Sequence, residues 1–176
     1  MVATRPAPAP PARARTRPTL LAILTLVALN LAAHLPGIGD PPNGYHAWRE
    51  SDTAAVAESF LRETGDILKP RIHQRWNTVG ITGMEFPIYN YAVALLYRVA
   101  GFHHWVPRLL SLLIGTIGLL GIRSLARSLG MTSEEALLAT FLAACAPLYF
   151  FYSRKIQPDI LLPTASCWAF FLFIRG

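Results

Sequence analysis

Charged residues are scarce in this sequence, and the catalytic motifs of many soluble enzymes are missing. Lys, Arg, Asp and Glu together make up 15% of the 176 residues, well below the share of about 25% that is usual in globular domains. The sequence has no P-loop, no GxGxxG, no DxD pair, no HExxH and no GxSxG. These absences argue against nucleotide-dependent enzymes and the common hydrolases, and nothing points to a soluble cofactor.

Cysteine is also rare, since the chain has only Cys145 and Cys167. Both lie inside apolar segments, and they form neither a disulfide framework nor a zinc-binding pattern. The cysteines therefore give no information about the redox compartment.

Long apolar runs are what the sequence has in place of charge. The mean hydropathy is +0.37, and the clustering of apolar residues is typical of membrane proteins. The net charge of +6 could suggest nucleic acid, but the basic residues lie in loops beside the apolar runs. Membrane topology explains that placement better, so we expect a lipid bilayer and no nucleic acid as a partner.

The apolar runs predict an all-α, polytopic transmembrane bundle with about four spans. Residues 1–18 are rich in Pro, Ala and Arg and contain no acid, so they are predicted to be a disordered basic tail. The spans are predicted near residues 19–35, 105–122, 136–152 and 160–174. A signal peptide is the rival interpretation of the first run, but the long tail and the further runs favour an uncleaved anchor.

Two juxtamembrane amphipathic helices are predicted in the loop of residues 37–104. The first would start at Ser51, Asp52 or Thr53, which are all good N-cap residues, and would end near Glu63.

The second of these helices is predicted within Phe86–Gly101. Its apolar face consists of Ile88, Tyr91, Ala92, Leu95, Leu96 and Val99. With a length of roughly 21 Å it is too short for a hydrocarbon core of about 30 Å, so we expect it to lie in the membrane interface.

The arginines predict the orientation of the chain. Those before the first predicted span are Arg5, Arg13, Arg15 and Arg17. They place the N-terminus in the cytoplasm, and Arg123 and Arg127 join it there if residues 86–101 do not span. The loop 37–104 and the turn SRKIQPD, residues 153–159, then face outward from a multi-pass protein of the plasma membrane.

Polar residues with catalytic potential gather on this external side. The stretch WRESDT contains Arg49 and Asp52, Glu85 precedes the interfacial helix, and Asp159 lies in the later external turn. Carboxylates and guanidinium groups at a membrane surface are suited to holding a lipid phosphate and deprotonating an acceptor hydroxyl.

Each of these residues also has a purely structural interpretation. Asp52 could cap the helix that it opens, Glu85 could interact with a helix dipole, and Asp159 could simply start the last helix. Arg71 and Arg75 could be solvated loop charges. The residues alone leave both interpretations open.

A series of short motifs follows these segments in order. W-R-x-x-D-T opens a helix after the first span, P-R-I follows, x-E-x-P-x-Y marks the interfacial helix, R-L-L-S-L begins the next span, and a P-D turn follows the third span. Over residues 18–176 this order resembles the N-terminal third of the GT-C superfamily of polyprenyl-phosphate-dependent glycosyltransferases. It is most similar to the family 39 group, with the protein O-mannosyltransferases and the bacterial aminoarabinose transferases of lipid A.

The resemblance implies a catalytic site. The family's acidic residue in the first external loop matches Asp52, and a second important acidic residue matches Asp159. The Glu before the interfacial-helix proline matches Glu85, which helps to bind a metal ion in some members, so a divalent metal ion at Glu85 is an expectation.

One position departs from the pattern. Related enzymes often carry a Lys between that Glu and the proline, near the lipid phosphate, and here the residue is Phe86. Binding of the donor's phosphate would then fall to other residues, among which we expect Arg49, Arg71 and Arg75.

The reaction implied by the resemblance is inverting sugar transfer on the external face of the membrane. The donor would be a polyprenyl-phosphate sugar, and the acceptor a hydroxyl of a lipid, glycan or protein. Asp52 would take the acceptor's proton while arginines stabilise the departing phosphate. Because family members have more spans and usually a C-terminal domain, we expect this chain to be a truncated piece.

The alternative is a non-enzymatic polytopic membrane protein, such as a transporter fragment or a scaffold. A transporter would place ionisable residues near the middle of the bilayer. Here they lie outside the predicted spans, apart from Arg108 near the end of one, which disfavours transport.

Overall fold

The computed structural model describes residues 16–176, and within them every regular element is a helix. The helices are α1 (Thr16–His34), α2 (Ala47–Arg62), α3 (Ile88–Ala100), α4 (Trp105–Ser128), α5 (Ser133–Cys145), α6 (Pro147–Tyr152), the short 3-10 helix η1 (Pro158–Ile160) and α7 (Leu161–Arg175). The predicted all-α class is thus confirmed. Most of the predicted disordered tail lies outside the described residues.

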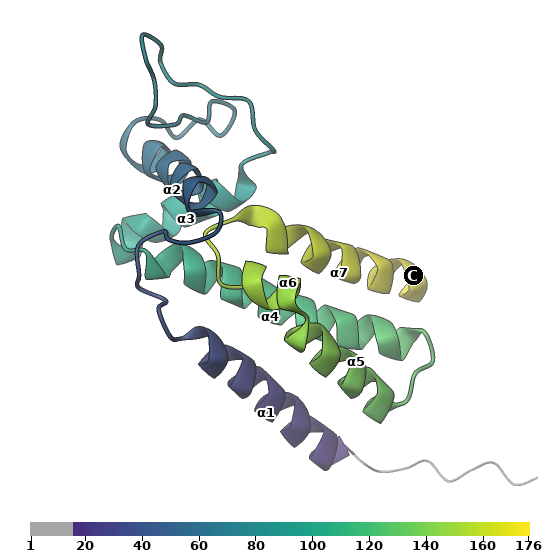
Figure 1. Cartoon of the computed structure of the whole chain (residues 1–176). Coiled ribbons are helices and arrows are strands. Elements are labelled where there is room, and N and C mark those ends of the chain that lie inside the picture. Colours follow the sequence, from purple (N-terminus) through teal and green to yellow (C-terminus); the bar gives the residue numbers. More distant parts are fainter. Residues whose placement is uncertain (1–15) are drawn as a thin grey trace, which may run out of the picture.

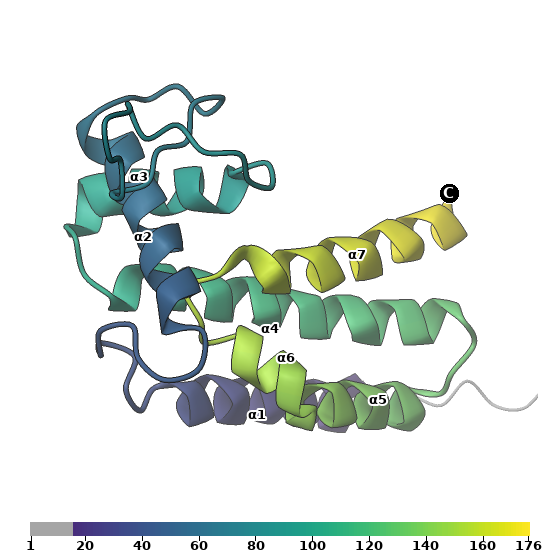
Figure 2. The same cartoon turned by 45° about the horizontal axis from the view of Figure 1, so that its top comes forward.

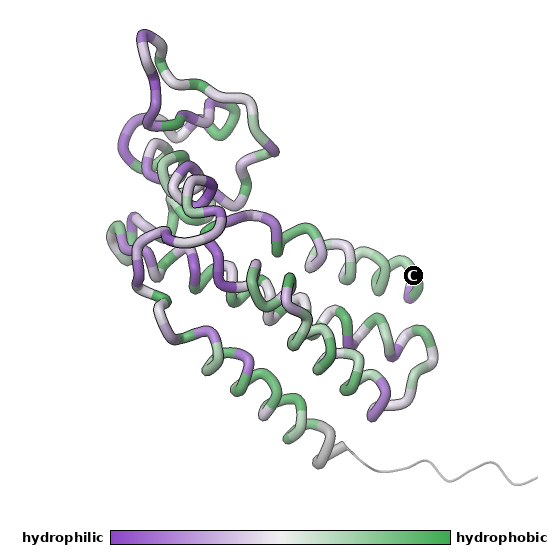
Figure 3. The backbone as a smooth tube through the Cα atoms, in the orientation of Figure 1, coloured by the Kyte–Doolittle hydropathy of each residue, from purple (hydrophilic) through white to green (hydrophobic). Residues whose placement is uncertain are grey.

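The helices divide into a long bundle and a polar cap at one end of it. Figures 1 and 2 show α1, α4, α5 with α6, and α7 extending from the same end of the molecule, where α2, α3 and their connecting loop gather. In Figure 3 the apolar residues follow the long helices, and the hydrophilic residues concentrate in the cap. This arrangement places the polar segments of the sequence together.

Helix α4 is the centre of the bundle, and α7 packs closely along it. Gly115, Gly118 and Gly121 are buried and share one face of α4, and a Cβ at each would collide with side chains of the α6–α7 region. The close approach lets Thr164 Oγ1 donate to Ile114 O at 3.1 Å and Trp168 Nε1 donate to Ile117 O at 3.1 Å. Small residues therefore permit side chain-to-backbone bonds between the two helices.

Among the described helices, α4 is the one that is both long and apolar enough to cross a membrane. The apolar part of α1, Leu20–His34, is shorter, and α7 has 15 residues. The other three spans therefore stay predictions.

The predicted span near 136–152 is two helices, so its description as one helix was wrong. Pro147 lacks a backbone N–H and restricts the residue before it. Ala146 accordingly adopts an extended conformation, with φ −63° and ψ 126°, and separates α5 from α6. Figure 2 shows α6 continuing from α5 with a bend.

Helix α2 begins earlier in the chain than the predicted N-cap residues, 51–53. Its first residue is Ala47, preceded by His46 in the left-handed region at φ 67° with no side-chain cap. Asp52 therefore lies in the second turn, and its interpretation as the N-cap was wrong. Tertiary contacts of Glu50 hold the first turn in place. Capping rules consider only the local sequence and so do not include such contacts.

Helix α3 turns its apolar stripe away from the protein. Ile88, Leu95 and Val99 of the predicted face are exposed, Val99 by 90%. The opposite face packs inward, and the buried Asn90 donates from Nδ2 to Thr53 O of α2 at 3.0 Å. The predicted place of α3 in a membrane interface is compatible with this outward apolar face and stays a prediction.

Candidate functional site

Arg49 connects two carboxylates that are distant in the sequence. Its guanidinium, on the first turn of α2, lies 3.1 Å from Glu85 Oε1 and 3.5 Å from Asp159 Oδ2. The three side chains are partly exposed, by 37%, 50% and 33% respectively. The structure thus brings together three of the residues that the sequence singled out, at the junction of the cap and the bundle.

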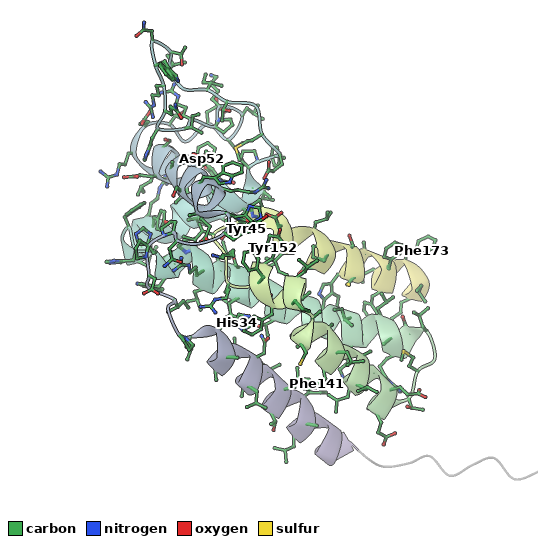
Figure 4. All side chains as sticks on the ribbon, in the orientation of Figure 1. His34, Tyr45, Asp52, Phe141, Tyr152 and Phe173 are labelled. Carbon is green, nitrogen blue, oxygen red and sulfur yellow. The ribbon has the colours of Figure 1, made fainter. Side chains whose placement is uncertain are left out.

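Asp52 lies next to this group on α2. It follows Arg49 by three residues, a spacing that places side chains on the same helix face with Cβ atoms about 5–6 Å apart. Its side chain is exposed, and within residues 16–176 it makes neither a hydrogen bond nor an ion pair. Figure 4 labels it on α2, within the cap. An exposed, unpaired carboxylate is available to accept a proton.

Arg71 and Arg75 lie at the other end of α2. Arg71 Nη1 is 3.4 Å from Glu63 Oε2, and Arg75 Nη2 bonds Glu63 Oε1. Eleven residues of helix separate Asp52 from Glu63, a distance of about 16 Å along the axis. The structure therefore does not bring these two arginines together with Asp52.

The bond from Arg75 lowers the pKa of the Glu63 carboxyl, since it favours the charged form. The pKa of Arg75 is raised for the same reason. With a lowered pKa, Glu63 supports the fold above the ordinary carboxyl pKa, and that support is lost as the pH falls through the folded-state pKa. The cluster thus ties the loop to the end of α2 at neutral pH.

Glu50 lies next to Arg49 on α2, and the sequence analysis did not identify it as part of this region. Its side chain is fully buried, with Oε1 at 2.6 Å from Lys155 Nζ and Oε2 at 3.3 Å from Arg108 Nη2. In the sequence it stands in a polar stretch and resembles a solvated charge. The one available signal was Arg108 itself, an arginine at the start of an apolar helix, which requires a partner there.

Gln157 was also missed. It is 1% exposed, and neither atom of its side-chain amide has a hydrogen-bond partner among the described residues. Buried amides are normally bonded, and this one precedes Asp159 by two residues. It leaves hydrogen-bonding capacity unused beside the site.

The described residues do not fit the divalent metal ion expected at Glu85. Residues 16–176 contain no group of three or more His, Cys, Asp or Glu side chains that could hold one. The position between Glu85 and Asp159 is taken by the guanidinium of Arg49. Arg49 supplies the positive charge there.

A large apolar cavity lies away from these residues. It has a volume of about 810 Å³, lies between α1 and α5, and is lined almost entirely by apolar side chains such as Leu26 and Phe141. It includes none of the charged residues of the cap and does not bear on the chemistry.

Comparison with known proteins identifies one family. The family model of the dolichyl-phosphate-mannose-protein mannosyltransferases matches residues 85–176, just over half of the chain. No curated protein and no solved structure matches. The matched segment contains Glu85 and Asp159, and the geometry joins Arg49 to both. This chain belongs to the dolichyl-phosphate-mannose-protein mannosyltransferase family, whose members are membrane glycosyltransferases of the GT-C type.

Proposed function

We propose that this protein transfers a sugar from a polyprenyl-phosphate donor to an acceptor hydroxyl on the external face of the plasma membrane. The family match carries the proposal. The contact of Arg49 with Glu85 and Asp159, next to the unpaired Asp52, supports it because the group combines a free base with a cation. The non-enzymatic alternative is not favoured, since family membership points to a glycosyltransferase.

In the proposed reaction the acceptor oxygen attacks the anomeric carbon of the donor sugar. Asp52 takes the proton of the acceptor hydroxyl as the new C–O bond forms. The bond from the anomeric carbon to the phosphate oxygen breaks, and its electron pair leaves with the polyprenyl phosphate. Arg49 stabilises the charge that develops on that phosphate, while Glu85 and Asp159 hold Arg49 in place.

Arg49 is better placed for the leaving phosphate than the two arginines at the far end of α2. The phosphate is bonded directly to the carbon under attack, so it must lie within a few ångströms of the acceptor oxygen. Arg71 and Arg75 pair with Glu63, which is about 16 Å from Asp52 along the helix axis. We propose that they bind an anionic group farther from the reaction centre.

The topology belongs to the proposal. α1, α4, α5 with α6, and α7 would cross the membrane, with the N-terminus in the cytoplasm and α2 and α3 outside. In a variant lacking Cys145 and Cys167, we expect Asn77→Cys to react with a membrane-impermeant maleimide in intact cells. Leu129→Cys, in the exposed connection after α4, should react only after permeabilisation. Labelling of position 129 in intact cells would contradict this orientation.

The activity is tested with radiolabelled donors in membranes of the protein's own host, which supply the acceptor. Dolichyl-phosphate [14C]mannose and its undecaprenyl-phosphate counterpart are the probes. We expect label to pass from the lipid fraction to an acceptor in membranes containing the protein, and not in membranes from which it has been deleted. Equal transfer in both membranes would contradict the proposal, and transfer from neither donor would exclude mannose as the sugar.

A further inference from the structure

The buried carboxylate of Glu50 is the centre of a polar network beneath the candidate site. Besides Arg108 and Lys155, the backbone N–H of Ile156 donates to Glu50 Oε2 at 3.3 Å. The side chain of Glu50 is 0% exposed, that of Arg108 6% and that of Lys155 13%. A carboxylate buried this deeply needs such charged and hydrogen-bonded partners.

Through Arg108 the network reaches the segment that follows α1. The guanidinium donates to Gly37 O at 3.1 Å and to Ile38 O at 3.3 Å, and it also bonds Asp40 O. Lys155 Nζ donates to Asn43 O at 3.4 Å. The two cations that hold Glu50 therefore also hold the chain that leads into α2.

A second branch reaches α3 and the turn that carries Asp159. Ser111 Oγ of α4 donates to Lys155 O at 2.7 Å, and Tyr89 Oη of α3 lies 2.7 Å from the same hydroxyl. Burial raises the pKa of Tyr89, and its hydroxyl also donates to Pro107 O at 2.9 Å. The network thus joins α2, α3, α4 and the turn that precedes Asp159.

The position of Glu50 in α2 links this network to the reacting groups. Successive residues of an α-helix are about 100° apart around its axis, so fixing Glu50 toward the 153–157 turn also fixes the direction of Arg49. Arg49 then meets Asp159, which follows Lys155 by four residues, and Asp52 lies one turn along the same face. Rotation or sliding of α2 would move both groups relative to Asp159.

We propose that Glu50 is a positioning residue for sugar transfer. It touches no substrate. Its buried ion pairs lock α2 against the 153–157 turn and thereby set the separation of Asp52 and Arg49 from Asp159. The inference rests on the proposed function for its catalytic consequence, but its geometric content concerns the position of α2 alone and can be measured without any donor.

The geometric test measures the distance between spin labels on α2 and α7. Ser51→Cys and Leu162→Cys, both at exposed positions, carry the labels in the full chain with Cys145 and Cys167 replaced by Ser. We expect a narrow distance distribution in this parent and a clearly broader or shifted one after Glu50→Gln, because the neutral amide no longer holds both cations. The matched control, Glu58→Gln, changes a carboxylate of the same helix that pairs with Arg62 at 2.9 Å, and should leave the distribution narrow.

A milder variant guards against a failure of Glu50→Gln to fold. Lys155→Gln keeps the Glu50–Arg108 pair and the bond from Ile156 N–H. It removes the ion pair with Glu50 and the bond to Asn43 O, so it should broaden the distribution to a smaller extent. If the distribution stays as narrow in Glu50→Gln and Lys155→Gln as in Glu58→Gln, the positioning role is overturned. That result would leave the proposed transferase activity untouched.

The kinetic test uses the donor that supports transfer by the parent. Glu50→Gln should lower kcat by about 10- to 100-fold, the scale of a misplacement near 1 Å, with a change in the donor's KM of less than roughly threefold because the donor-binding groups are intact. Glu58→Gln should match the parent in both. A raised KM with an unchanged kcat would overturn the proposal, whereas inactivity of the parent would count against the proposed function and not against the geometry.

Discussion

Asp52→Asn is expected to lower sugar transfer by about 100-fold or more, the scale usual for a lost general base. The amide has the size of the carboxylate but cannot accept the acceptor's proton. Asp52 is exposed and unpaired among the described residues, so the substitution should leave folding and membrane insertion unchanged. Its effect should therefore appear in kcat with the wild-type amount of protein in the membrane.

The control for this variant is Asp66→Asn, the same substitution in the loop after α2. Asp66 bonds Lys69 at 3.0 Å and lies outside the candidate site, so its replacement should leave transfer near the wild-type rate. Because Asp52 is inside the helix, Asp52→Ala should also fold normally and should be as inactive as Asp52→Asn. Near-full activity of Asp52→Asn would remove Asp52 as the base and make Asp159 the first candidate.

The part of the site that could be predicted from the sequence is the part that topology determines. Arginine placement and helix length predict that Asp52, Glu85 and Asp159 lie on one side of a membrane, and the structure places Glu85 and Asp159 on the same guanidinium. Short polar segments between apolar helices must lie at one end of the helix bundle or the other. Which of them touch is decided by packing, and the sequence pattern alone did not separate Arg49 from Arg71 and Arg75.

Glu50 shows what the pattern could not reveal. Its partners Arg108 and Lys155 lie 58 and 105 residues away in the chain, and no periodicity connects them. A carboxylate between an arginine and a serine in a loop-like stretch has the composition of a solvated surface. Its burial follows from the meeting of α2, α4 and the 153–157 turn, which is a tertiary event.

The predicted helix boundaries were wrong for different reasons. Pro147 was visible in the sequence, and the rule that a proline interior to a helix breaks it would have separated α5 from α6. The start of α2 was not visible, because His46 offers no capping side chain and the first turn is held by Glu50. In α3 the predicted apolar face is largely exposed while Val93 and Ala94 on the other side are buried, because periodicity does not say which face meets protein and which meets lipid.

Arg49→Gln is expected to reduce transfer by roughly 100- to 1,000-fold, the loss seen when one donor to a developing negative charge is removed. The substitution removes the proposed partner of the departing phosphate. It also leaves Glu85 and Asp159 without the cation that they share, so two carboxylates would face the phosphate and repel it. Single-turnover rates with bound donor would measure this loss separately from binding.

Arg75→Gln provides the matched comparison, since it removes the same group at the opposite end of α2. Arg75 pairs with Glu63 about 16 Å from Asp52, so its loss should weaken donor or acceptor binding and leave the single-turnover rate within a fewfold of wild type. Arg49→Lys keeps the charge but cannot bridge two carboxylates in the planar manner of a guanidinium, and should fall between wild type and Arg49→Gln. If Arg75→Gln slows the bound-donor step as much as Arg49→Gln does, the phosphate leaves at the Glu63 end of the helix. Asp52 would then be too far away to act on the acceptor.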